Sequence, residues 1–186
     1  MNDGDHAIPE DARDHQADGR IAWLLVAAQF LLIAMIVLLG GSDAWPVPHW
    51  LDQIAGVGVA LGLVVMILGA TRLGRGLTAA PLPNAHARLR TGGLYRYVRH
   101  PIYSGLLLFA IAHTIAAASY VQLALCLLLL GLIAVKARWE ERRLVERFPA
   151  YAAYAAHTPR YIPFAPVPRA EATVPAPEDG QGNRDV

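Results

Sequence analysis

The stretch that decides the fold is RLRTGGLYRYVRHPIYS, residues 88–104, a polar segment that separates two apolar halves of the chain. It combines arginines and tyrosines with a Gly-Gly pair and a His-Pro step. Proline suits the first turn of a helix, where its missing N–H costs nothing, and it disfavours helical geometry in the residue before it. We therefore expect a helix to begin near Ile102, with its free N–H groups and positive dipole end facing Arg99 and His100. Such a helix start can accept a carboxylate or a phosphate.

The composition of the chain is that of a membrane protein. Its 186 residues are 55% hydrophobic and 17% charged, which is too apolar for a soluble domain of this size and enough for a single domain. We predict an all-α integral membrane protein with four transmembrane helices and a cytoplasmic C-terminal helical cap. The domain extends over residues 21–164, with spans at about 21–39, 51–70, 102–118 and 121–135. The polar ends, 1–20 and 165–186, are predicted to be disordered tails.

Several classes of function are excluded by residue counts. The single cysteine, Cys126, lies in an apolar run, which excludes a disulfide framework, a CxxC redox pair and a cysteine zinc site within one chain. The seven histidines show no HExxH or comparable ligand spacing, so no metal site is expected. The net charge is +1 with no broad basic surface, so we expect no nucleic-acid partner. The oligomeric state is left undetermined.

The second apolar run contains the glycine-rich sequence GVGVALG, residues 56–62. Its spacing is one residue too long for a nucleotide-binding loop, and no separate strand precedes it. Gly58 and Gly62 instead fit the small-xxx-small pattern by which membrane helices approach closely. Gln29 and Gln122 lie within apolar runs, where we expect them to form hydrogen bonds between helices.

The distribution of Lys and Arg predicts the topology. Residues 40–50 and the short link between the third and fourth spans contain neither, whereas the 71–101 loop and the segment after Val135 are rich in them. Basic residues favour the cytoplasmic side. We therefore expect a multi-pass protein of a bacterial inner membrane with both termini in the cytoplasm. The 88–104 segment and a charged helix at about 136–148 then lie on the same side.

Further short motifs follow the fourth span. Together with the first polar segment, the motifs in order are Gly93-Leu94-Tyr95, Arg99-His100-Pro101-Ile102-Tyr103, Glu140-Glu141, Phe148, Tyr151, Tyr154 and Pro159 to Pro163. This order resembles the isoprenylcysteine carboxyl methyltransferase and phospholipid methyltransferase superfamily of integral-membrane methyltransferases, over residues 89–164. The resemblance implies a cytoplasmic pocket for S-adenosylmethionine under a C-terminal cap. It also implies a lipophilic acceptor that enters from the bilayer.

The resemblance also implies roles for single residues. Those implied to bind the cofactor are Leu89, Arg90, Tyr95, His100, Pro101, Ile102, Tyr103 and Glu140. Catalytic roles fall to Arg99 and Glu141. Lys136 occupies the position of a substrate-binding arginine, and a lysine cannot hold a carboxylate in the same bidentate way. This departure, with Ala87 and Pro149, leaves the acceptor open among an isoprenylcysteine carboxylate, a lipid and another small molecule.

The residues themselves are compatible with methyl transfer. A sulfonium methyl donor needs a positioned nucleophile and excluded water, and its positive charge favours carboxylates and aromatic faces. Arg99 or Lys136 would orient a carboxylate acceptor, whereas Glu141 would take the proton of an amine or a thiol. Two alternatives remain: a membrane reductase that uses NADPH, and a non-enzymatic four-helix membrane protein whose arginines only set its topology.

Overall fold

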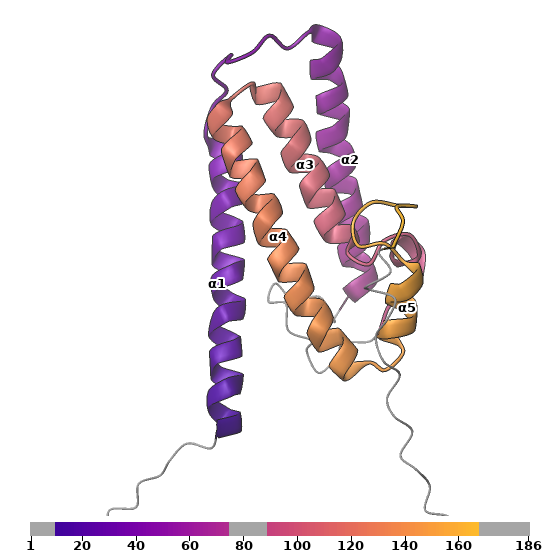
Figure 1. Cartoon of the computed structure of the whole chain (residues 1–186). Helices are drawn as coiled ribbons and strands as arrows, with labels where there is room; N and C mark the ends of the chain where they lie inside the picture. The colour runs from indigo at the N-terminus through magenta and orange to yellow at the C-terminus, as the bar shows by residue number, and fades with distance from the viewer. Residues whose placement is uncertain (1–9, 75–88, 168–186) are drawn as a thin grey trace, which may run out of the picture.

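The computed structural model describes residues 10–74 and 89–167 (Figure 1). Within these two ranges all regular structure is helical and there is no strand, which confirms the predicted all-α class. The elements in order are α1 (Glu10–Leu38), α2 (His49–Leu73), the 3-10 helix η2 (Gly93–Arg96), α3 (Pro101–Ala117), α4 (Tyr120–Arg147) and α5 (Tyr151–His157).

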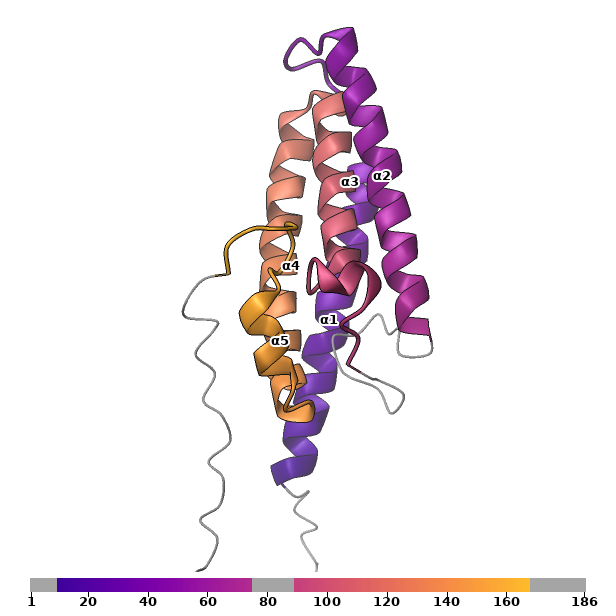
Figure 2. The same ribbon diagram turned by 90° about the vertical axis from the view of Figure 1, so that its right-hand side faces the viewer.

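The centre of the fold is an antiparallel hairpin of α3 and α4. The two helices are joined by Ala118 and Ser119, and Ala118 adopts the left-handed conformation with φ of 46°. The helix α1 packs on α4, and α2 packs extensively on α3, so α1 and α2 lie on opposite sides of the hairpin (Figure 1). Figure 2 shows η2, α5 and the segment after α5 together on one side of the bundle, beside the lower half of α4.

Three helical segments are long and apolar enough to cross a membrane. They are Gly19–Leu38 within α1, the whole of α2, and α4. The apolar α3 has 17 residues, which is roughly 26 Å of helix against about 30 Å of hydrocarbon. Large hydrophobic side chains are exposed along these helices, including Leu38, Ile67 and Leu128. Lipid-facing surfaces have this composition, so the chain is a membrane protein.

The helices α2 and α3 touch through glycines, which we call the glycine seam: Gly58, Gly62 and Gly105. A Cβ atom added at Gly62 would lie 2.7 Å from the carbonyl oxygen of Gly105, and one added at Gly105 would lie 2.6 Å from that of Gly62. At Gly58 the added atom would lie 2.9 Å from Cβ of Ala112. The predicted packing role of Gly58 and Gly62 is confirmed, and residues 56–62 are helical within α2.

A hydrogen bond fixes the end of the bundle at the α3–α4 turn. The buried Gln122 donates a hydrogen bond from Nε2 to the carbonyl oxygen of Leu39 at 2.6 Å, which ties the end of α1 to α4. This confirms the prediction that Gln122 forms a hydrogen bond between helices. Between the two ends of the bundle, the core contains Ile36, Leu129 and Ile133, all fully buried.

Residues 10–20, which belong to the segment predicted to be a disordered tail, form the first turns of α1. The sequence accounts for this in physical terms. Pro9 is followed by Glu10 and Asp11, whose negative charges favour the start of a helix, and no further proline interrupts the segment. Residues 1–9 lie outside the described residues. So do residues 168–186, which make up most of the predicted C-terminal tail.

Candidate functional site

The start of α3 is fastened to the segment that follows α5. Pro101 is the first helical residue and is buried, as the His-Pro step predicts. The backbone N–H of Arg99 donates to the carbonyl oxygen of Pro159 at 2.8 Å, and that of His100 to Arg160 at 3.1 Å. These bonds bring the side chains of Arg99, His100 and Arg160 to the same side of α4.

The carboxylate of Glu141 on α4 is the meeting point of these side chains. It lies 2.9 Å from Nε2 of His100, 3.2 Å from Nη1 of Arg99 and 2.5 Å from Nη2 of Arg160. The Nε of Arg160 donates to the same carboxylate at 3.0 Å, so the Arg160 contact is bidentate. Glu141, Arg99 and His100 are buried. We call this group, together with the neighbouring Glu140, the charged junction.

Glu140 is the more accessible carboxylate of the charged junction. Its side chain is 27% exposed, against 10% for Glu141. The hydroxyl of Tyr103 donates to Oε2 of Glu140 at 2.9 Å, and Nδ1 of His100 lies 3.8 Å from the same oxygen. The rings of His100 and Tyr103 stack with centroids 5.2 Å apart. The polar segment 88–104 and the charged part of α4, distant in the sequence, therefore lie close enough to contact the same small molecule.

Lys136 extends the polar contacts toward α1. Its Nζ donates to Oε1 of Gln29 at 2.6 Å and lies 5.5 Å from the ring centroid of Tyr103. The side chain of Lys136 is buried, one turn before Glu140 on α4. Gln29 therefore forms the predicted hydrogen bond between helices, and its partner is a residue of the candidate site.

Four tyrosines surround the junction from η2, α5 and the following segment. Burial raises the pKa of Tyr95, Tyr151 and Tyr154 above the ordinary value, and that of Tyr161 to about 12. All four hydroxyls therefore stay protonated. Tyr154 donates to the carbonyl oxygen of Tyr95 at 2.5 Å, and Tyr95 donates to that of Gly69 at 3.3 Å. These bonds link α5 to η2 and η2 to α2.

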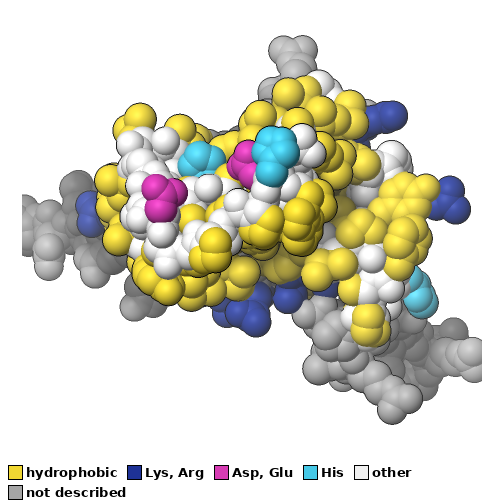
Figure 3. Space-filling view, turned by 90° about the horizontal axis from the view of Figure 1, so that it is seen from above, with side chains coloured by type: hydrophobic (Ala, Val, Ile, Leu, Met, Phe, Trp, Pro, Cys, Tyr) yellow, Lys and Arg dark blue, Asp and Glu magenta, His cyan; other side chains and the backbone are white. Residues whose placement is uncertain are grey.

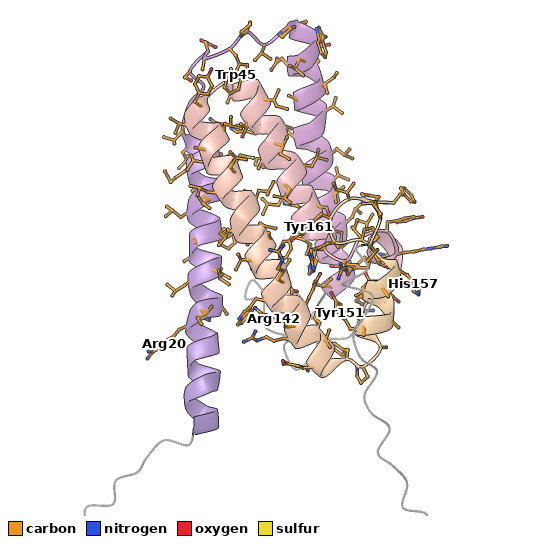
Figure 4. All side chains as sticks on the ribbon, viewed as in Figure 1. Arg20, Trp45, Arg142, Tyr151, His157 and Tyr161 are labelled. Atoms are coloured by element: carbon orange, nitrogen blue, oxygen red, sulfur yellow. The ribbon has the colours of Figure 1, made fainter. Side chains whose placement is uncertain are left out.

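The hydroxyl of Tyr151 differs from the other three. It is buried and, within the described part of the chain, has no hydrogen-bond partner. It lies close enough to Glu141 and Arg99 for their charges to act on its pKa. A buried hydroxyl without a partner carries an energetic cost, and one beside a charged cluster is a candidate donor to a ligand. In Figure 4, Tyr151 lies between the lower part of α4 and α5.

Four of the residues predicted to bind the cofactor show no hydrogen bond or ion pair with the charged junction among the described residues. Leu89 is half-buried and Arg90 is exposed in the non-helical segment before η2, and among the described residues neither forms a hydrogen bond or ion pair with the charged junction. Pro101 and Ile102 pack against α2, where Cγ1 of Ile102 would lie 2.9 Å from a Cβ atom added at Gly69. A role of these four residues in cofactor binding stays a prediction.

Arg160 and the hydroxyl of Tyr151 are two features of the site that no sequence motif indicates. The signal for Arg160 is modest: a charged residue lies between Pro159 and Pro163, in a segment too short and irregular for an ordinary surface helix. Only the backbone pairing with Arg99 and His100 reveals its contact with Glu141. Tyr151 belongs to the motifs quoted above, but nothing in its spacing indicates that its hydroxyl is buried.

The comparison with protein families identifies a match over most of the chain. The family described as NnrU protein matches residues 7–173, a range that includes every helix of the structure. No match is found among curated proteins. NnrU is a different family from the isoprenylcysteine carboxyl methyltransferase superfamily, so the membership inferred from the motifs is wrong. Those motifs are short, and they include a proline at a helix start and charges at a membrane boundary, which physical constraints favour in unrelated membrane proteins.

Proposed function

The chain belongs to the NnrU family, and we propose that it transfers a methyl group from S-adenosylmethionine to a lipophilic acceptor in a membrane. The observation that carries the proposal is the hydrogen bond of 2.9 Å between Tyr103 and Glu140. It places an aromatic face and a partly exposed carboxylate beside the arginines and the imidazole of the charged junction.

The mixture of charges favours this donor over a dinucleotide. S-adenosylmethionine carries a carboxylate, an ammonium and a sulfonium close together, so it needs acidic and basic groups at one place. The charged junction supplies both, with Glu140 and Glu141 beside Arg99 and Arg160. NADPH carries several negative phosphates and no cationic group, so it offers no partner for the accessible carboxylate of Glu140. The reductase alternative is therefore less well supported.

Particular residues fit the parts of this donor. Glu140 is the accessible partner for its ammonium or sulfonium, and the faces of Tyr103 and His100 suit a cation or the adenine ring. The unpartnered hydroxyl of Tyr151 is a donor for a polar atom of the ligand. When bound, the cofactor supplies an electrophilic methyl group. The protein's task is then to align the acceptor and exclude water.

The acceptor side of the proposed site is the contact between α1 and α4. Lys136 is buried there and donates a hydrogen bond to Gln29 of α1. A carboxylate or another polar head on an apolar tail would be oriented by Lys136 while its tail stays in the bilayer. Glu141 is held by three basic side chains, which makes it a weak proton acceptor and suits it to positioning Arg99 and Arg160.

The proposal includes four spans and a cytoplasmic site. The helix α3 crosses with its ends at the headgroups, and η2, α5 and the following segment form the cap. Figure 3 supports this orientation: the face seen from above, around the turn from α3 to α4, shows acidic and histidine side chains, with Lys and Arg only toward its edges. The opposite end carries the charged junction and the basic last turns of α4. Both termini are then cytoplasmic.

The same contacts favour one other function. Because Glu141 satisfies Arg99, His100 and Arg160 together, the charged junction is also suited to fastening the C-terminal segment in a non-enzymatic membrane protein. Such a protein would need no accessible carboxylate at Glu140. The two functions therefore differ in what neutralising Glu140 does.

Transfer of an isotopically labelled methyl group tests the proposal. Membranes that contain the protein are incubated with S-adenosylmethionine labelled at the methyl group, and the lipid extract is analysed by mass spectrometry. We expect a labelled lipophilic product, and its formation should fall by about tenfold or more in Glu140→Gln, since one charge-assisted contact with the donor is lost. Glu146→Gln, an exposed site on the same helix, is the matched control and should retain the activity. Extracts identical to those of membranes without the protein would refute methyl transfer.

A further inference from the structure

The segment after α5 returns from the charged junction toward the apolar part of the bundle. The hydroxyl of Ser104 donates to the carbonyl oxygen of Tyr161 at 2.7 Å, and the hydroxyl of Tyr161 donates to that of Ile133 at 3.3 Å. Ser104 follows His100 by one turn of α3, and Ile133 precedes Lys136 by about one turn of α4. Tyr161 therefore lies on the apolar side of the charged residues. In Figure 4 it is closer than Tyr151 to the end of the bundle that carries Trp45.

Large apolar side chains are exposed immediately after Tyr161. Ile162 is 69% exposed and Phe164 is 87% exposed. The ring of Tyr97, which follows η2, is 45% exposed and meets Phe164 edge to face with centroids 5.8 Å apart. The backbone N–H of Ala165 donates to the carbonyl oxygen of Ile162 at 3.2 Å, so a turn presents Ile162 and Phe164 outward. We call Tyr97, Ile162 and Phe164 the apolar wedge.

We propose that the apolar wedge is an interfacial membrane anchor that inserts into the boundary between headgroups and acyl chains. Its depth carries the proposal, because the hydrogen bonds of Tyr161 hold the wedge level with the first apolar turns of α3 and the last of α4. Those turns continue into helix surfaces that are themselves exposed and apolar. Aromatic residues with a polar edge, such as Tyr97, are favoured at this boundary, and the exposed Arg96 beside it is placed to meet lipid phosphates.

The anchor has a consequence for the charged junction. Arg160 comes two residues before Ile162, and its guanidinium holds Glu141. Insertion of the wedge therefore holds Arg160 in place and closes the segment over Glu141 from the membrane side. This link does not depend on the reaction, so the anchor can be tested apart from methyl transfer.

Spin-label accessibility measures the depth of the wedge directly. Phe164→Cys is made in a Cys126→Ala background, labelled with a nitroxide and reconstituted into nanodiscs of phosphatidylcholine and phosphatidylglycerol. We expect the label to collide with oxygen more than with a water-soluble nickel chelate, as a label at the lipid-facing Leu130→Cys does. Collisions with the chelate should be several-fold fewer than at the exposed Glu146→Cys.

Two results would overturn the anchor. Chelate collisions at Phe164→Cys equal to those at Glu146→Cys would place the wedge in water. Low accessibility to both reagents would place it in a protein contact, such as a second copy of the chain. If Phe164→Cys does not fold, the label at Ile162→Cys makes the same measurement, because Ile162 is also exposed at the same turn.

Discussion

Two contacts of opposite character lie along α3: the glycine seam with α2, and the charged junction that Arg99 and His100, just before α3, form with α4. At the seam, backbone meets backbone, and a single added Cβ atom would lie 2.6 Å from a carbonyl oxygen. At the junction, a carboxylate is surrounded by basic side chains at 2.5 to 3.2 Å. His100 and Gly105 are little more than one helical turn apart. The contacts therefore change from charge-based to shape-based over a short distance, as the proposed passage of α3 from the headgroup region into hydrocarbon requires.

The largest effect on stability is expected when the junction loses its central charge. Glu141→Gln keeps the shape of the side chain but leaves Arg99 and Arg160 without their shared carboxylate in a buried place. Removal of one partner from a buried ion pair costs about 3–5 kcal/mol. We expect a marked fall in the melting temperature of the purified protein in detergent. Glu146→Gln serves as the control, and a Glu141→Gln protein that melts with the wild type would show that the junction does not hold the fold together.

A smaller loss of stability is expected when the helices at the glycine seam are forced apart. Gly105→Ala adds one methyl group against the backbone of Gly62 and Met66, so α2 and α3 must separate. Overpacking of this kind costs about 1–3 kcal/mol. The matched control is Gly131→Ala on α4, where an added Cβ atom meets nothing within 4 Å. Thermal unfolding should separate the two variants, and equal melting temperatures would contradict the close contact at the seam.

The smallest effect on stability is expected at Tyr151. Tyr151→Phe removes a buried hydroxyl that has no hydrogen-bond partner in the described chain, so stability should be unchanged or rise by up to about 1 kcal/mol. Affinity for S-adenosylhomocysteine should nevertheless fall, because the hydroxyl is proposed to meet the ligand. Unfolding and binding are measured on the same preparation. A loss of stability with unchanged affinity would assign Tyr151 to the fold alone.

The contrast between seam and junction also explains how much the sequence could predict. Helix positions, the start of α3 and the glycines of the seam follow from local patterns: apolar runs, a His-Pro step and small residues one turn apart. The contact of Tyr103 with Glu140 follows from the hairpin of α3 and α4. Because only two residues join α3 to α4, the helices are antiparallel, and the first turn of α3 lies beside the last turns of α4.

The other features of the site depend on contacts between distant residues, which no local sequence pattern predicts. Backbone hydrogen bonds from Arg99 and His100 hold residues 158–164 against the start of α3, and such pairing leaves no periodicity in the sequence. The depth of Lys136 depends on Gln29 in a helix more than one hundred positions away. Acidic composition is compatible both with disorder and with a helix N-terminus, so composition alone does not predict where α1 begins. The family was missed because the motifs lie in only part of the range that matches.

Binding of the methyl donor is the central claim, and isothermal titration calorimetry of the protein in nanodiscs tests it most directly. S-adenosylhomocysteine, the stable demethylated product, is titrated in parallel with NADPH. The account predicts saturable binding of S-adenosylhomocysteine that weakens by about tenfold in Glu140→Gln, and no binding of NADPH. Absence of heat with S-adenosylhomocysteine, or binding of NADPH alone, would contradict it.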